Sequence, residues 1–228
     1  MPNILRALFI HGVGEQEADF ADDARHHLGT ACAARGVALH PEIVHWAPLA
    51  DRPERAFLRA VKGKGSQGNA MQKLTVGTLA DALMYATSPE LQKSIFQLLD
   101  QQMWMLGGKK ATIFAHSLGG LIATDWLRQR PELSDVRLVT LGCNIGLFTL
   151  GRHFAPVPAL GKPEAWINVF SPRDLLGFPL AVDPALAHVQ DHATGVGGWF
   201  TGWTGLAHIR YWNDASLWSK KIPDLLDI

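Results

Sequence analysis

Short apolar segments alternate with helix-like segments in the second half of the chain, and this alternation restricts the fold more than any other feature. We expect strands at 110–115, 136–141, 166–170 and 188–192, and helices at 118–130 and 214–226, with an interruption near Pro223. Strands joined by crossover helices pair in parallel, and the helices then cover both faces of the sheet. The pattern therefore predicts an α/β fold with a mostly parallel central sheet.

The N-terminal region begins with the same kind of unit. Residues 4–10 form an apolar run that predicts a buried strand, which ends at the glycine-rich segment 11–14. A helix is expected over 15–35 and a second strand over 39–46. Pro41 places that second strand at the edge or the start of the sheet, because proline has no N–H to donate to a ladder.

Residues 50–108 carry few strand signals and long helical patterns. Ser88, Pro89 and Glu90 predict a helix start, with Ser88 as the N-cap and Pro89 at the first helical position. A length of 228 residues suits one domain, so we interpret 1–228 as a single domain and 50–108 as a helical insertion or cap within it. The alternative is an ordinary helical layer packed on the sheet.

The formal net charge is zero, with 21 basic and 21 acidic side chains. A neutral protein has no long-range attraction to nucleic acid or to an anionic membrane, so we expect neither as a partner. The apolar runs are too short for a signal peptide or a spanning helix, which favours a cytoplasmic protein with no transmembrane segment. Cys32 and Cys143 are interpreted as free thiols, with a disulfide as the alternative. The oligomeric state stays open.

The segment Ala115-His116-Ser117-Leu118-Gly119-Gly120 lies between a predicted strand and a predicted helix. Small residues two before and two after the serine allow a turn sharp enough to lift its hydroxyl clear of the sheet. The hydroxyl then lies at a helix N-terminus, where the N–H of Leu118 can face an oxyanion. Ser117 is therefore our candidate nucleophile, and the alternative is an incidental serine at a glycine-containing helix start.

Two segments together resemble the lipase/esterase branch of the α/β hydrolases: Phe9-Ile10-His11-Gly12-Val13-Gly14 and Phe114-Ala115-His116-Ser117-Leu118-Gly119-Gly120. The chain is similar in particular to intracellular lipases and deacylases that carry a His-Gly-(Ile/Val)-Gly turn after the first strand. The resemblance implies the α/β-hydrolase fold and an oxyanion hole formed by the backbone N–H groups of Val13 and Leu118. Glycines do let a backbone approach a reacting carbonyl closely, and a plain strand-to-helix turn is the alternative.

In that fold the acid and the histidine of the catalytic triad follow the serine in chain order. Four histidines follow Ser117: His153, His188, His192 and His208. His208 comes after a glycine-rich stretch and before the closing helix, where a base can reach a serine, and residues 207–212 resemble the family's small-His-x-x-Tyr-Trp stretch. We therefore expect His208 to be the base, with the other three histidines as alternatives.

The acid is expected in the turn after the strand at 166–170. Asp174 occupies this turn, where the resemblance also places the acid, and it would accept a hydrogen bond from His208 Nδ1. Asp183 and Asp191 are the competing carboxylates. A plain turn-forming role is the alternative for Asp174 itself.

Large apolar side chains gather near the C-terminus. Trp199 and Trp203, together with His11, are expected to contact the substrate in an apolar pocket. Core packing is an equal alternative for the tryptophans. Parts of 50–108 and of 193–206 are expected to cover the nucleophile, as in lipase-like relatives.

Three further patterns do not change this interpretation. Residues 63–68 match a dinucleotide-binding fingerprint, but no predicted strand precedes them. Two groups contain side chains of the kinds that bind metals: Asp22, Asp23, His26 and His27, and His188, Asp191 and His192. A solvated helix face is the more ordinary explanation of the first group, and the second group is treated with the same caution. We expect neither a metal nor a cofactor.

The candidate residues predict hydrolysis of a carboxylic ester, of a small molecule or a lipid, by acyl transfer through Ser117. His208 would act as general base and then as general acid. A thioesterase or an amidase would use the same triad. A non-catalytic binding protein that retains the fold is the alternative from another functional class.

Overall fold

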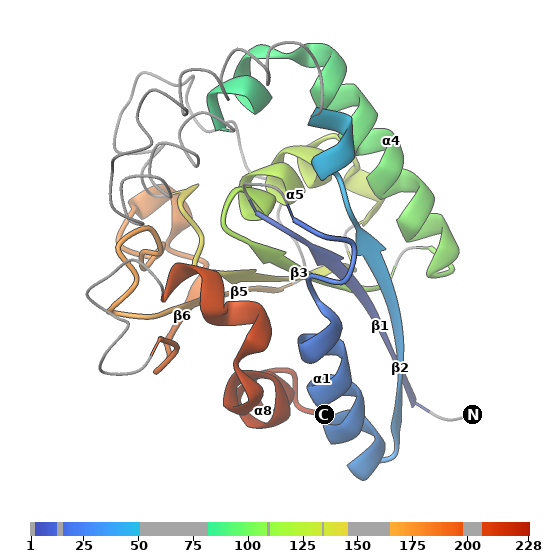
Figure 1. The fold of residues 1–228 in the computed structure, drawn as a ribbon, viewed down its shortest axis with the longest axis vertical. Coiled ribbons are helices and arrows are strands. Elements are labelled where there is room, and N and C mark those ends of the chain that lie inside the picture. The colour runs from blue at the N-terminus through green and yellow to red at the C-terminus, as the bar shows by residue number, and fades with distance from the viewer. Residues whose placement is uncertain are drawn as a thin grey trace.

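A computed structural model describes residues 3–12, 16–50, 82–108, 110–133, 135–145, 165–197 and 207–228 of the chain. Its centre is one six-stranded sheet (Figure 1). The strands are β1 (Asn3–Ile10), β2 (Val37–Val44), β3 (Thr112–His116), β4 (Arg137–Leu141), β5 (Ala165–Phe170) and β6 (Gln190–Ala193). They lie in the order β2-β1-β3-β4-β5-β6, and every neighbouring pair is parallel. The predicted parallel sheet is confirmed.

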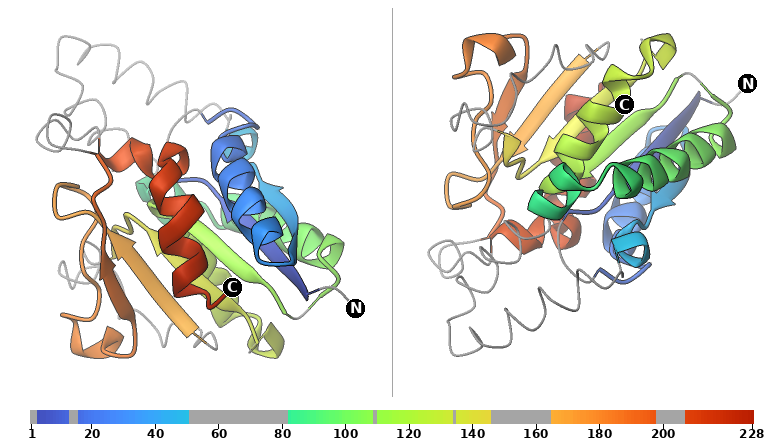
Figure 2. Two further views of the ribbon diagram at one scale, coloured as in Figure 1. Left: turned by 90° about the horizontal axis from the view of Figure 1, so that it is seen from below. Right: turned by 90° about the horizontal axis from the view of Figure 1, so that it is seen from above.

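Helices cover both faces of this sheet. The longer ones are α1 (Asp22–Ala34), α4 (Pro89–Met105) and α5 (Leu118–Arg128). Successive side chains of a strand point to opposite faces, so Leu8 and Ile10 of β1 pack in one buried cluster with residues of α4 and α5, whereas Ala7 and Phe9 pack in another with residues of α1. Figure 2 shows α1 and the C-terminal helices on one face, and α4 and α5 on the other. The chain has the α/β-hydrolase fold.

The edge position of β2 agrees with the proline in it. Pro41 lies within β2, and β2 is the outermost strand, paired with β1. A missing N–H is tolerated at such an edge. Helix α1 begins later than expected, at Asp22 rather than near residue 15. Asp22 and Asp23 then fall in its first turn, where a negative carboxylate interacts favourably with the helix dipole.

Strand β6 also begins later than expected. The residues before it form a short 3-10 turn, η3 (Pro184–Leu186), which Asp183 caps by accepting from Ala185 N at 2.9 Å. Val189 N still donates to Leu186 O at 2.9 Å, so this residue closes the turn instead of entering the ladder. The strand therefore starts at Gln190, and His188 lies outside it.

Helix α4 belongs to the layer that covers the sheet. Its predicted start is confirmed, because the Ser88 side chain accepts from Leu91 N at 3.3 Å and Pro89 takes the first helical position. Its buried residues are Leu91, Ile95, Phe96, Leu99 and Met103, which share a cluster with β1 and β3. The other part of the expected insertion, 51–81, lies outside the described residues.

The closing segment changes helix type along its length. It contains a 3-10 turn, η5 (His208–Asn213), a π-helical turn, η6 (Leu217–Lys221), and α8 (Ile222–Leu225). Pro223 has no N–H, and its ring crowds the carbonyl four residues earlier. The wider π turn directly before it relieves this conflict. The interruption predicted near Pro223 is therefore a change of helix geometry and not a break.

Two features expected from composition can be compared with the structure. Cys32 and Cys143 are free thiols, and both are buried. They pack in the clusters on opposite faces of the sheet, which keeps them apart. Among the helices of the described ranges, none is both long and apolar enough to cross a bilayer.

Candidate active site

Ser117 occupies the sharp turn between β3 and α5. Its backbone angles are φ 53° and ψ −124°, a conformation that costs a residue with a side chain about 1–3 kcal/mol. Such strain persists only where contacts hold the backbone, and Ser117 N donates a 3.0 Å hydrogen bond to Leu141 O at the end of β4. The hydroxyl is thereby fixed at the carboxyl end of the sheet, directly before Leu118, the first residue of α5.

The turn after β1 lies against the sharp turn at Ser117, which we call the elbow. A Cβ atom on Gly12 would lie 2.7 Å from Ser117 Cβ, and one on Gly119 would lie 2.7 Å from His11 O. Real side-chain carbons do not approach so closely, so the two backbone segments can meet only because both residues are glycine. Val13, the expected second oxyanion donor, directly follows Gly12 but lies outside the described residues.

Two helical glycines allow a matched test of this close approach. Gly119→Ala should lower the free energy of unfolding by about 1–3 kcal/mol, because the new methyl group meets backbone oxygens that cannot move aside. Gly29→Ala in α1 should raise it by about 0.5–1 kcal/mol, since the nearest atom, Leu39 Cδ2, lies 3.6 Å away. Denaturant unfolding curves measure both. Equal responses of the two variants would contradict the tight packing at Gly119.

The structure brings Ser117, Asp174 and His208 into one hydrogen-bonded chain. Ser117 Oγ lies 2.8 Å from His208 Nε2. His208 Nδ1 lies 2.9 Å from Asp174 Oδ2 and 3.1 Å from Oδ1. A carboxylate only accepts, so Nδ1 carries the proton and Nε2 is left to accept from the serine hydroxyl. This is the tautomer in which a histidine can take a proton from serine.

The carboxylate of Asp174 is buried and ionised. Burial opposes its charge, but the hydrogen bond and charge of His208, the N–H of Leu176 and the hydroxyl of Tyr211 together hold the pKa of Asp174 below its ordinary value. Leu176 N donates to Oδ1 at 2.9 Å. Tyr211 in turn accepts from Ser171 N at 2.9 Å, and burial raises the pKa of Tyr211, so its hydroxyl stays protonated beside Asp174.

His11 is turned into the protein, contrary to the expectation that it contacts substrate. It is fully buried, and its Nε2 accepts from the N–H groups of Trp46 at 3.1 Å and Ala47 at 3.2 Å. Nδ1 donates to Gly12 O at 2.8 Å, and the ring stacks on Trp46 with 4.8 Å between centroids. Both ring nitrogens have backbone partners, so His11 fixes the turn after β1 and has no nitrogen left to offer to a substrate.

The competing residues lie elsewhere or hold structural contacts. His188 is exposed, His192 lies on β6, and His153 lies outside the described residues. Asp183 caps a short turn. Asp191 accepts hydrogen bonds from three donors, Asn168 Nδ2, Leu180 N and Ala181 N.

The side chains of Ser117 and His208 are shielded from solvent. Ser117 is 0% exposed and His208 is 1% exposed. The residues that directly follow Asp174 and His208, Leu175 and Ile209, are large apolar residues that are 51% and 47% exposed. Trp199 and Trp203, the expected pocket residues, lie outside the described part of the chain.

Sequence reasoning missed two residues of the site, Tyr211 and His116. Tyr211 stands three residues after His208 in a 3-10 turn, a spacing that places both side chains on the same side. The small-His-x-x-Tyr-Trp stretch carried that signal. His116 is 92 residues from His208 in the sequence, but its Nε2 lies 2.7 Å from His208 O. No spacing in the sequence indicates this contact.

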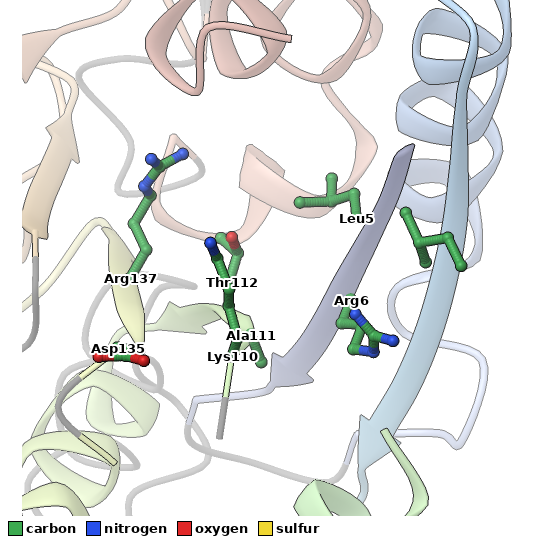
Figure 3. Close-up of a pocket in the computed structure, with 8 residues that line it drawn as sticks. Leu5, Arg6, Lys110, Ala111, Thr112, Asp135 and Arg137 are labelled. Atoms are coloured by element: carbon green, nitrogen blue, oxygen red, sulfur yellow. The ribbon is translucent and has the colours of Figure 1, made fainter. Parts of the chain in front are cut away.

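A separate cavity of about 140 Å³ lies at the other end of the strands (Figure 3). It is lined at the starts of β1, β3 and β4 by Ile4, Leu5, Arg6, Lys110, Ala111, Thr112, Asp135 and Arg137. Parallel strands all begin at one edge of a sheet and end at the other, so this cavity is remote from Ser117, which follows the end of β3. It plays no part in the candidate active site. Within the described ranges, no group of three or more His, Cys, Asp or Glu side chains could hold a metal ion.

Comparison with known proteins gives similarity in fold at low sequence identity. No protein-family model and no curated protein sequence matches the chain. One similar solved structure is a protein of unknown function from Agrobacterium tumefaciens, provisionally called an alpha/beta hydrolase, with 11% identity, a TM-score of 0.47, and coverage of 100% of this chain and 88% of the other. Another is the esterase domain of a Rhodothermus marinus protein, with 11% identity, a TM-score of 0.43, and coverage of 96% and 88%.

Proposed function

We propose that this protein is a serine hydrolase that cleaves a carboxylic ester through an acyl-enzyme intermediate. The observation that supports the proposal most strongly is the chain of short contacts from Ser117 Oγ through the imidazole of His208 to the carboxylate of Asp174. The strained backbone of Ser117 supports it further, because strain in a folded protein gathers where function needs a particular geometry.

Each group of the triad has a defined chemical task. As Ser117 Oγ attacks the acyl carbon, its proton passes to His208 Nε2, and Asp174 stabilises the imidazolium that forms. His208 then returns this proton to the departing alcohol, which leaves the acyl group bonded to Ser117. In the second half, water attacks the acyl carbon and gives its proton to His208, which protonates Ser117 as the acid product departs. No cofactor is required.

The oxyanion of both tetrahedral intermediates needs hydrogen-bond donors. Leu118 opens α5, and the first N–H groups of a helix have no carbonyl partner within it. We propose Leu118 N as one donor and Val13 N as the other. The close approaches of Gly12 to Ser117 and of Gly119 to His11 support this pairing, because they bring the turn after β1 to the start of α5. Two such donors stabilise charge that develops only during the reaction.

The choice of an ester rests on the sequence resemblance to intracellular lipases and deacylases. The exposed apolar side chains of Leu175 and Ile209, next to two members of the triad, are consistent with an apolar acyl group. A thioester or an amide would use the same residues. We retain the proposal that parts of 50–108 and 193–206 cover the nucleophile and that Trp199 and Trp203 line the acyl pocket.

A fluorophosphonate probe tests the nucleophile without knowledge of the substrate. The probe bonds to a serine only when a base has activated it, so the wild-type protein should be labelled and Ser117→Ala should not. Ser171→Ala is the matched control: Ser171 is buried near the site and its hydroxyl donates to Val196 O at 2.8 Å, so its loss should leave labelling intact. An unlabelled wild-type protein that is folded would overturn the proposal and favour a binding role.

A further inference from the structure

We infer that His116 is a positioning residue that holds the base His208 in register with the nucleophile. The inference rests on the proposed function, since it concerns how that triad is assembled. His116 is the last residue of β3 and directly precedes Ser117. The position of its side chain is therefore set by the same strand that sets the nucleophile.

The contact between the two histidines is direct. His116 Nε2 lies 2.7 Å from the backbone O of His208. A carbonyl oxygen only accepts, so Nε2 of His116 carries the proton and donates it. The two imidazole rings also lie against each other, with centroids 4.8 Å apart. The side chain of His116 thus holds the backbone of the base, His208, by a hydrogen bond.

The same ring touches the rest of the turn that carries the base. His116 lies 5.5 Å from the ring of Tyr211 and 5.9 Å from that of Trp212, centroid to centroid. Tyr211 is one of the residues that hold the pKa of Asp174 below its ordinary value. The position of η5 relative to Ser117, and through Tyr211 that of the acid, is therefore constrained by one side chain.

His116 positions His208 without carrying a charge. Burial and the neighbouring charge of His208 lower the pKa of His116 to about 3, against the weaker opposing effect of Asp174. At neutral pH it is a neutral donor. A second cation beside His208 would oppose the imidazolium that forms when Ser117 attacks. A neutral hydrogen bond to the carbonyl fixes the base and leaves its ring free to accept the proton.

Replacement at one position separates positioning from packing. His116→Phe keeps an aromatic ring of similar size but removes the donor. His116→Gln places an amide N–H near the former Nε2, and His116→Asn has a side chain too short to reach His208 O. Misplacement of a catalytic group by about 1 Å costs about 10²-fold in rate, so we expect kcat for a p-nitrophenyl ester, and the rate of fluorophosphonate labelling, to fall about 10²-fold in the Phe and Asn variants.

The inference further requires that KM stays near the wild-type value in these variants and that His116→Gln recovers most of the lost kcat. His26→Phe, an exposed histidine on α1, is the control and should match wild type. Rates are expressed per folded molecule, with the folded fraction taken from thermal melts. If His116→Phe fails to fold, the comparison of His116→Gln with His116→Asn decides. Wild-type kcat in the Phe or Asn variants, or equal losses in Gln and Asn, would overturn the inference while leaving the proposed function intact. An inactive wild-type protein would overturn both.

Discussion

Ser117→Ala and His208→Ala should each lower kcat for an ester substrate by about 10⁶-fold, and the double variant should lose no more than either single one. The reason lies in the 2.8 Å contact between Ser117 Oγ and His208 Nε2. Neither group works without the other, because the serine hydroxyl is a weak nucleophile until a base removes its proton, and without the serine no acyl-enzyme forms for the base to act on.

The measurement is steady-state hydrolysis of a p-nitrophenyl ester by the wild type, the two single variants and the double variant, with folding checked by circular dichroism. KM should change little, since the lost interaction forms in the transition state. His188→Ala is the matched control, because this histidine is exposed and lies before β6, and its kcat should equal that of wild type. Independent, multiplying losses in the double variant would show that Ser117 and His208 do not act as one unit.

Much of the sheet could be predicted because its strands are marked locally. The apolar run of β1 and the strands β3, β4 and β5 are buried along nearly their whole length, so their composition alone indicates them. Strand β6 is harder to predict, because only four residues pair and none of them is buried. Its start depends on where the preceding turn closes, which composition does not specify.

The candidate site shows the same division between local and long-range information. Ser117 can be recognised from its neighbours, because a sharp turn demands small residues at fixed spacing. Asp174 and His208 can be narrowed down by chain order. The orientation of His11 and the contact of His116 with His208 cannot, because both depend on which way a ring points between segments that are 35 and 92 residues apart. The packing around each ring determines its direction, and the local sequence is compatible with either direction.

Asp174→Asn should lower kcat by about 10⁴-fold while the protein stays folded. Leu176 N donates to Oδ1 at 2.9 Å, so an asparagine at this position keeps its carbonyl oxygen there and turns its NH₂ group toward His208 Nδ1. Nδ1 must then accept, which moves the ring proton to Nε2. In that tautomer Nε2 faces Ser117 Oγ as a donor and cannot take the serine proton.

The size of the loss in kcat distinguishes this change of tautomer from simple destabilisation of the fold. Asp183→Asn is the matched control, since Asp183 accepts from Ala185 N at 2.9 Å in a surface turn and makes no contact with the triad. It should change stability by about 1 kcal/mol at most and leave kcat unchanged. Hydrolysis rates and fluorophosphonate labelling of the two variants, normalised to the folded fraction, give the comparison. An Asp174→Asn variant that keeps more than a tenth of wild-type kcat would show that the carboxylate does not set the tautomer of His208, and the acid of the triad would have to be sought elsewhere.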